Sequence, residues 1–309
     1  MTQHAQLDRL DRAREVSGYQ TQPAQMRAAA SGKVGELRLG FSMRNGRSIL
    51  SDLYRVAPLL VQQALYWDEA MPELPICAII SVGGGILQGD RYKIDIRVEE
   101  AACAHVTSQS ANRIHQMDAN YASQHQSIHV ESGAYLEYLP DFTIAYRNSR
   151  FINQTDVVIA PDATLLYGEM MLAGRKHHHA GERFGLDTLS VGVIVRRPDG
   201  GKLFAEKILI EKDDPTIEDP AVMRGFDAMA NIMCVTPPAV AARIKERFET
   251  HFPQAPRRAA AGLSALPNGA GLMLRAVGME TYDVREQVRR FWRIVREEAR
   301  GRTLPDAFP

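Results

Sequence analysis

Short segments in which apolar and polar residues alternate recur along most of the chain. In the segment 92–98, YKIDIRV, every second residue is apolar and the residues between them are charged. A period of two predicts a strand with one buried face. Similar segments, separated by turns rich in Gly, Asp, Asn and Pro, predict strands at 36–41, 49–56, 76–82, 92–98, 101–108, 127–131, 134–139, 142–146, 155–159, 164–170, 189–196, 202–210, 228–235 and 271–277.

Helical periodicity is confined to the C-terminal third. A first helix is predicted at about 238–250, after two prolines, and a second at about 281–300. In the second segment the apolar residues share one helical face and Arg and Glu occupy the rest. Gly301 is expected to end this helix because glycine is common just beyond a helix C-terminus.

Many short strands with little helix between them predict a mainly β protein and exclude a doubly wound α/β fold. A sandwich, a barrel and a solenoid all remain compatible with this pattern. Residues 1–31 are polar and charged, and we expect a poorly ordered lead-in there. Residues 32–309 are expected to form a single domain, with a β scaffold at 32–215 and a mixed C-terminal part.

Composition narrows the class of protein. Lys plus Arg and Asp plus Glu both number 37 in 309 residues, which argues against a general binder of nucleic acid or of membrane surfaces. The chain has no apolar run of about 18 residues and no secretory signal in its first 30. Cys77, Cys103 and Cys234 form no Cys-x-x-Cys motif, so we expect reduced, buried thiols in a cytoplasmic protein.

A cluster of glycines separates two predicted strands. Gly83, Gly84, Gly85 and Gly89 follow the apolar run 76–82, and Asp90 follows them. A dinucleotide-binding turn, and with it an oxidoreductase, would need the last glycine to open a helix. Here an alternating strand begins instead, so we interpret the glycines as a tight connection that needs positive φ or close backbone approach.

Three consecutive histidines are the first candidate for metal binding. On an extended chain His177 and His179 share a face about 6.6 Å apart at ~3.3 Å per residue. With oxygen from Glu169 or Glu182 they would suit a transition metal, and a metal-dependent enzyme is one alternative. A solvated loop without a metal is the other.

Conventional catalytic motifs are absent from the sequence. There is no Gly-x-Ser-x-Gly elbow and no P-loop, so we predict no catalytic activity of its own. Glu137, Asp141 and Glu169 lie in or beside predicted strands and would suit general acid–base chemistry. Ordinary salt bridges provide the competing interpretation, with partners at Arg113, Arg147 and Arg175. The residues alone favour a scaffold over an enzyme.

Five collinear motifs over about 33–300 resemble the UreD/UreH family of urease accessory proteins. They are the glycine turn Gly83–Asp90, the segment Thr107–Ile114 (TSQSANRI), the segment Gly133–Pro140 (GAYLEYLP), Leu172–Arg175 followed by Gly181–Phe184, and Gly271–Gly278 followed by the helix containing Trp292 and Arg296. Each motif is weak alone, but their order along the chain is specific.

The resemblance implies a chaperone-like scaffold for urease maturation, with a right-handed β-helix-like fold and a few helices, chiefly C-terminal. It implies binding to urease accessory proteins F and G and to apo-urease, an indirect link to accessory protein E, and no nucleic acid or membrane. No cofactor is expected to bind tightly. Transient Ni²⁺ is expected along a polar passage, with Glu137, Asp141, Glu169, His177 and His179 as candidate ligands.

Overall fold

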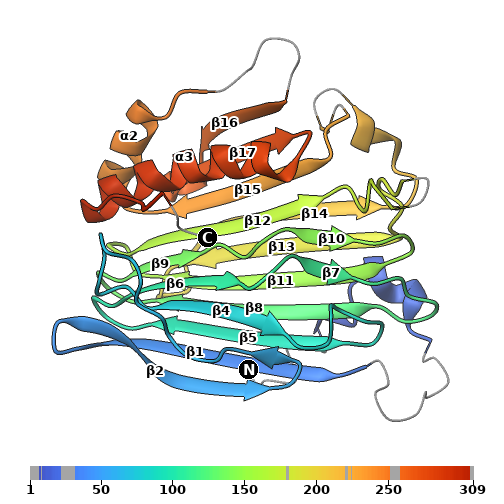
Figure 1. The fold of residues 1–309 in the computed structure, drawn as a ribbon, viewed down its shortest axis with the longest axis horizontal. Coiled ribbons are helices and arrows are strands. Elements are labelled where there is room, and N and C mark those ends of the chain that lie inside the picture. Colours follow the sequence, from blue (N-terminus) through green and yellow to red (C-terminus); the bar gives the residue numbers. More distant parts are fainter. Residues whose placement is uncertain are drawn as a thin grey trace.

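Two β-sheets packed face to face form the body of the molecule, and two helices cover the outer face of one sheet (Figure 1). The computed structural model describes residues 7, 9–21, 32–178, 181–219, 222–223, 225–250 and 258–306. In Figure 1 the strands run side by side across the molecule, with β1 and β2 at one end and the helices α2 and α3 at the other.

The first sheet has seven strands, of which the central ones are parallel and the outermost pair at each edge is antiparallel. Their order across the sheet is β14 (Lys202–Glu211), β13 (Thr188–Arg196), β11 (Arg150–Ile159), β8 (Ala122–Val130), β5 (Arg91–Val98), β1 (Val34–Arg44) and β2 (Arg47–Val56).

The second sheet has ten strands and is also mixed. Its main path is β16 (Ala259–Ala265), β17 (Gly271–Gly278), β15 (Ala228–Val235), β12 (Thr164–Leu172), β9 (Tyr135–Tyr138), β6 (Cys103–Ser108), β4 (Ile76–Ser81) and β3 (Leu59–Leu60). Two further strands lie off this path, β7 (Asn112–Ile114) and β10 (Thr143–Ala145).

Consecutive strands alternate between the two sheets from β4 to β13, apart from the short β7 and β10. Each return to a sheet places the new strand parallel to the previous one, so Cys103 of β6 pairs with Tyr135 of β9, and Tyr135 pairs with Thr164 of β12. The prediction of a mainly β protein is confirmed. A right-handed β-helix is not confirmed, because both sheets are mixed and have open edges.

The predicted strands are present, but several strands extend further than the alternation indicates. The first halves of β8 and β11 are polar, with the sequences ASQHQ and RFINQ, and alternation did not identify them. The pattern also missed β7, and β16 was missed because its Ala- and Gly-rich sequence has no contrast between faces. Both polar half-strands contribute residues to a cavity between the sheets.

Both predicted helices are present, as α2 (Pro238–Arg247) and α3 (Thr281–Arg300). The apolar face of α3 is buried against the ten-stranded sheet, at Val284, Val288, Phe291, Trp292 and Val295. The described residues also contain three short 3₁₀ helices, η1 (Arg14–Tyr19), η2 (Pro215–Glu218) and η3 (Pro267–Gly269). Within the described ranges, no helix is both long and apolar enough to cross a membrane.

The N-terminal lead-in needs a correction. The described part of it is packed against the seven-stranded sheet, where Leu10 and Val16 are buried with Tyr121 and Ile152. Glu15 accepts a hydrogen bond from Ser190 Oγ at 2.8 Å. The polar composition of this segment concealed the two apolar residues that attach it, and residues 22–31 lie outside the described residues.

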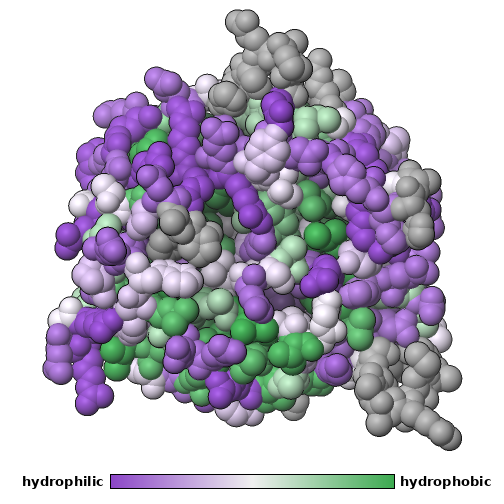
Figure 2. Space-filling model, in the orientation of Figure 1, coloured by the Kyte–Doolittle hydropathy of each residue, from purple (hydrophilic) through white to green (hydrophobic). Residues whose placement is uncertain are grey.

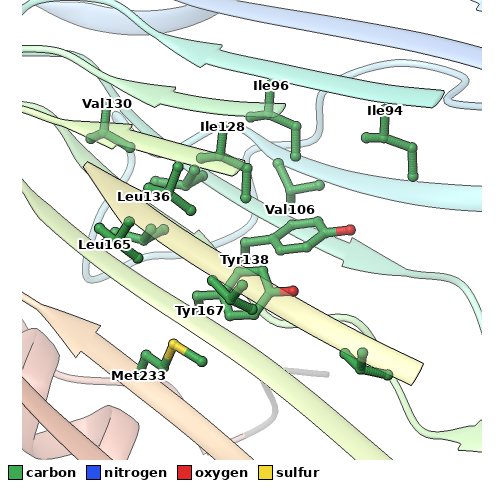
Figure 3. Close-up of a cluster of buried hydrophobic side chains, with 14 of the residues drawn as sticks. Ile94, Ile96, Val106, Ile128, Val130, Leu136, Tyr138, Leu165, Tyr167 and Met233 are labelled. Carbon is green, nitrogen blue, oxygen red and sulfur yellow. The ribbon is translucent and has the colours of Figure 1, made fainter. Parts of the chain in front are cut away.

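The main core lies between the two sheets and contains the inward residues of both (Figure 3). In the close-up, Ile94, Ile96, Ile128 and Val130 of one sheet face Leu136, Leu165 and Met233 of the other, with Val106, Tyr138 and Tyr167 beside them. The two tyrosine hydroxyls point to the same side of this cluster. The hydroxyls of Tyr138 and Tyr167 donate there to Gln126 and Glu169.

The outer surface is uneven in character. In Figure 2, hydrophilic residues occupy much of the periphery, and apolar residues gather in the centre and lower half, over strands rather than over α2 and α3. Exposed apolar side chains of the described residues include Tyr54 of β2 and Trp67 in the segment between β3 and β4.

Candidate functional site

A cavity of about 130 Å³ opens between the two sheets. Its mouth is formed by the glycine turn at Gly84 and Gly85 and by residues 108–113, which connect β6 to β7. Its interior is lined by inward side chains of β5, β8, β9, β11 and β12, with polar ones at Gln124, Gln126, Tyr138, Asn153, Tyr167 and Glu169.

The polar side chains of the interior form one hydrogen-bond network between the sheets. Gln126 donates to Thr155 Oγ1 at 2.9 Å and to Asn153 Oδ1 at 3.3 Å. Thr155 Oγ1 lies 2.9 Å from the hydroxyl of Tyr167, and the hydroxyl of Tyr138 donates to Gln126 Oε1. Strand alternation places these groups inward, where each needs a partner because an unpaired polar group in a core is unfavourable.

Glu169 is the one carboxylate inside this network. The hydroxyl of Tyr167 donates to its Oε1, and Asn153 Nδ2 lies 3.5 Å away. Burial raises the pKa of Glu169 to about 7, and the hydrogen bond from Tyr167 only partly opposes that effect. The described residues provide no ion pair for this side chain. The charged form of Glu169 is therefore less favoured than that of an exposed glutamate.

A second carboxylate, Glu137, is fully buried and lies on the other face of the ten-stranded sheet. Arg296 of α3 donates to both of its oxygens, at 2.8 and 2.7 Å. His105 Nδ1 lies 2.9 Å from Oε2, and Trp292 Nε1 donates to Oε1 at 2.7 Å. Arg296 also contacts Asp68. Burial alone would raise the pKa of Glu137, but Arg296 and His105 outweigh it and hold the pKa at about 2.

The Glu137 cluster has the properties of a structural ion pair. Glu137 and Arg296 are fully buried, and the paired groups neutralise one another. The ring of His105 stacks on Trp292 with centroids 5.1 Å apart. The cluster therefore fixes α3 to strands β6 and β9, and it leaves no free carboxylate oxygen for a ligand.

Comparison with known proteins decides the family. The model of the UreD urease accessory protein family matches residues 33–307. A urease accessory protein UreD 2 of Methylorubrum extorquens (strain PA1) is 74% identical over 305 residues, which cover 99% of this chain and 98% of that protein. The chain belongs to the UreD family. A UreD protein of Yersinia pseudotuberculosis (serotype O:1b, strain IP 31758) is 48% identical over 296 residues, covering 96% of this chain and 92% of its own.

Two of the motifs that resemble the UreD family form the mouth of the cavity. Gly84 and Gly85 belong to the glycine turn, and residues 108–113 belong to the segment Thr107–Ile114. A third motif, Gly133–Pro140, contributes to both buried sites, because Tyr138 faces the cavity and Glu137 faces α3.

The glycine turn has the backbone predicted for it. Gly84, Gly85 and Gly89 have φ values of 76°, 142° and 78°. A Cβ on Gly85 would lie 2.5 Å from the carbonyl oxygen of Arg113, so only glycine fits there. Strand β5 begins at Arg91 with no intervening helix, so the dinucleotide-binding alternative is wrong. Gly83 has no positive φ in this turn.

Asp90 closes the same turn with its side chain. One carboxylate oxygen accepts from the backbone nitrogen of Lys33 at 2.9 Å. The other accepts from the backbone nitrogen of Leu87 at 2.9 Å and from the Tyr92 hydroxyl at 2.8 Å. Asp90 is therefore a structural part of the UreD glycine turn.

The five predicted ligands do not come together. Glu169 lies inside the cavity, whereas Glu137, the partner of Leu166 in the pairing of β9 with β12, points to the opposite face, since Tyr138 occupies the inward position. Asp141 lines the mouth and pairs with Arg285 of α3. Ordinary salt bridges were expected to Arg113, Arg147 or Arg175, but Asp141 and Glu137 pair with Arg285 and Arg296 of α3, and Glu169 has no ion pair among the described residues.

The histidine cluster contributes little to a site. His177 is exposed in a turn, and His179 lies outside the described residues. Glu182, its suggested oxygen ligand, is paired with Arg175. Across the described ranges of the chain, no three His, Cys, Asp or Glu side chains come together in a way that would hold a metal ion.

Sequence reasoning missed most of the cavity wall. Gln124, Gln126 and Asn153 occupy the polar half-strands of β8 and β11, which alternation did not identify. A signal was present, because residues 126, 128 and 130 share one face of a strand and only the first of them is polar. An inward polar residue continuing an apolar row indicates an internal polar site.

Proposed function

We propose that this protein is a chaperone-like scaffold in the maturation of urease, and that it passes Ni²⁺ through the cavity between its two sheets. The observation that carries the proposal is Glu169, a carboxylate without an ion pair among the described residues, inside a polar cavity whose mouth consists of motifs resembling the UreD family. Carboxylate, amide and hydroxyl oxygens suit a hard-to-borderline dication, and weak oxygen ligands suit transfer better than storage.

Accessory proteins F and G and apo-urease are the proposed partners, with accessory protein E acting indirectly. A cation carried to apo-urease has to enter and leave this protein while it is bound to others, and the cavity mouth lies at the surface. The scaffold itself is proposed to coil right-handed, because parallel crossover connections have that hand in about 98% of cases. The proposed location is the cytoplasm, where the three free cysteines would stay reduced.

The competing function, a metal-dependent enzyme built on the triple histidine, receives less support. His177 is exposed, and Glu182 is already paired with Arg175. We therefore propose a non-catalytic role, consistent with the accessory proteins to which this chain is similar.

The test replaces the charge inside the cavity without changing its shape. Glu169→Gln keeps the size and the hydrogen bond to Tyr167, whereas Glu131→Gln removes a carboxylate of an exposed pair as a matched control. For Glu169→Gln we expect normal complexes with accessory proteins F and G, an unchanged or higher melting temperature, and less nickel per urease by elemental analysis. Full nickel content in the urease matured with this variant would contradict the proposed route.

A further inference from the structure

Asn231 of β15 lies beside Glu169 on the inner face of the ten-stranded sheet. The two residues are direct partners in the antiparallel pairing of β12 with β15, and such partners share a face. The neighbours of Asn231 at alternate positions, Met229 and Met233, belong to the core between the sheets. Asn231 itself is 4% exposed.

The amide oxygen of Asn231 is buried and has no hydrogen-bond partner. An unpaired buried acceptor destabilises a fold by about 1–3 kcal/mol, so the position would favour an apolar residue if only packing mattered. The next strand in the same row carries Arg275, opposite Asn231, and its guanidinium is paired with Glu206 of β14. Glu169, Asn231 and Arg275 therefore form one row across the sheet, which begins at the cavity and ends at the ion pair between Arg275 and Glu206.

We propose that Asn231 Oδ1 and the Glu169 carboxylate together bind the divalent cation as a pair of oxygen ligands. This inference rests on the proposed function, since it takes the cation route for granted and adds a ligand to it. Direct partners in an antiparallel pair have Cβ atoms about 5 Å apart, which allows both side chains to reach one ion. Water completes the coordination, as hard and borderline cations prefer oxygen.

Two protein oxygens make a weak site, which is what a transfer point needs. A closed set of four protein ligands would retain the ion, whereas an ion that keeps several waters exchanges readily. The site also gives a partner to the orphaned oxygen of Asn231: Gln126, Thr155 and Tyr167 of the cavity pair with one another, whereas Asn231, on the strand beside Glu169, has no acceptor contact.

The experiment measures Ni²⁺ binding to the purified full-length chain without an affinity tag, together with accessory protein F where that is needed for solubility. All variants carry His177→Ala, His178→Ala and His179→Ala, so that surface imidazoles do not bind the metal. Titration calorimetry and the shift of the melting temperature with Ni²⁺ are recorded for the parent, Glu169→Gln, Asn231→Leu and Asn231→Asp.

Gln287→Leu is the matched control. Its amide oxygen is also buried without a partner, but it lies on α3, away from the cavity. We expect Asn231→Leu to weaken Ni²⁺ binding at least tenfold while its metal-free melting temperature stays at or above that of the parent. Asn231→Asp is expected to bind more tightly than the parent, and Gln287→Leu equally well.

The outcomes separate this inference from the function on which it rests. Weaker binding in Glu169→Gln with parental binding in both Asn231 variants would overturn the role of Asn231 and leave the route through Glu169 standing. Parental binding in Glu169→Gln, together with full nickel content of the urease, would remove both. If Asn231→Leu does not fold, Asn231→Asp decides, and an affinity no higher than the parent's overturns the inference.

Discussion

Two carboxylates lie on neighbouring strands of one sheet and have opposite environments. Glu137 of β9 faces α3 and is bound by Arg296, whereas Glu169 of β12 faces the other sheet and has only hydroxyl and amide neighbours. Their pKa values diverge accordingly, to about 2 for Glu137 and about 7 for Glu169. The different partners thus favour the charged form of Glu137 and the protonated form of Glu169, each relative to an exposed glutamate.

The difference shows how to tell a carboxylate that serves the structure from one that is free to bind a ligand. Every oxygen of Glu137 has strong donors, including the guanidinium of Arg296, so its charge is fully used in holding α3. The charge of Glu169 is balanced by nothing among the described side chains, and the fold tolerates it beside a cavity. Glu137 is the more deeply buried of the two, at 0% exposed, and yet it is the one whose charge is favoured, because it has a cation partner.

The largest expected effect on stability comes from breaking the ion pair of the Glu137 cluster. Glu137→Gln leaves Arg296 without its bidentate partner in a dry environment, and we expect the free energy of unfolding to fall by about 3–5 kcal/mol. Urea unfolding followed by circular dichroism measures it. A loss below about 1 kcal/mol would show that the Glu137 cluster does not hold α3.

The next largest effect concerns the shape of the cavity mouth rather than its charge. Gly85→Ala places a Cβ 2.5 Å from a carbonyl oxygen at φ 142°, and we expect a loss of about 3 kcal/mol. Gly84→Ala, with φ 76° and open space around it, is the matched control and should lose only about 1 kcal/mol. Equal melting temperatures for the two variants would refute the close approach at Gly85.

A smaller effect, of opposite sign to that of Glu137, is expected from the pH dependence of Glu169. Its pKa in the folded state is raised from 4.5 to about 7, so the folded protein binds the extra proton between these values and loses stability as pH rises through them. Glu169→Gln should remove roughly 2 kcal/mol of this loss between pH 5 and 8. Thermal melts at these two pH values measure it, and parallel pH profiles for wild type and variant would contradict the raised pKa.

Glu137 provides the internal contrast for that experiment. Its pKa is lowered from 4.5 to about 2, so its contribution to stability is present above about 4.5 and is lost as pH falls toward 2. The two carboxylates therefore act in separate pH windows, and the window between pH 5 and 8 reports on Glu169 rather than on Glu137.

The smallest effect is expected at the mouth, where Asp141 pairs with Arg285 at a half-exposed position. Exposed ion pairs contribute little, so Arg285→Met should change the free energy of unfolding by less than about 1 kcal/mol. The free energies of unfolding of Arg285→Met and Glu137→Gln, measured together in urea, provide the comparison. A loss as large as that of Glu137→Gln would mean that α3 depends on both of its arginines.

Much of the fold could be predicted because alternation reports burial directly. The segment 92–98 became β5, the apolar face of 281–300 became the buried face of α3, and the glycine turn has the positive φ values that its residues indicated. The layered arrangement could not be predicted, since strand order depends on pairings between residues about 30 positions apart, such as Cys103 with Tyr135.

The site was predictable only in part. Glu169 was identified as a candidate, but nothing local indicated that Glu137 and Glu169 would point to opposite faces, since this depends on the register of β9 with β12. Arg296 and Glu137 are separated by 159 positions in the chain, so their pairing also had to come from the structure. Asn231 gave no signal, because an orphaned oxygen is a property of three-dimensional surroundings.

Pairing between strands also sets a length scale inside the cavity. Neighbouring strands lie about 4.8 Å apart, so Glu169 of β12, which lines the cavity, is followed at that spacing by its partner Asn231 on β15 and then by the exposed Arg275 on β17. On the opposite wall, the neighbouring strands β8 and β11 carry Gln124 and Asn153. The side-chain oxygens of Gln124 and Asn153 on one sheet, and of Glu169 and Asn231 on the other, therefore come from strands at this fixed spacing, and the backbone hydrogen bonds of the sheets keep the spacing constant.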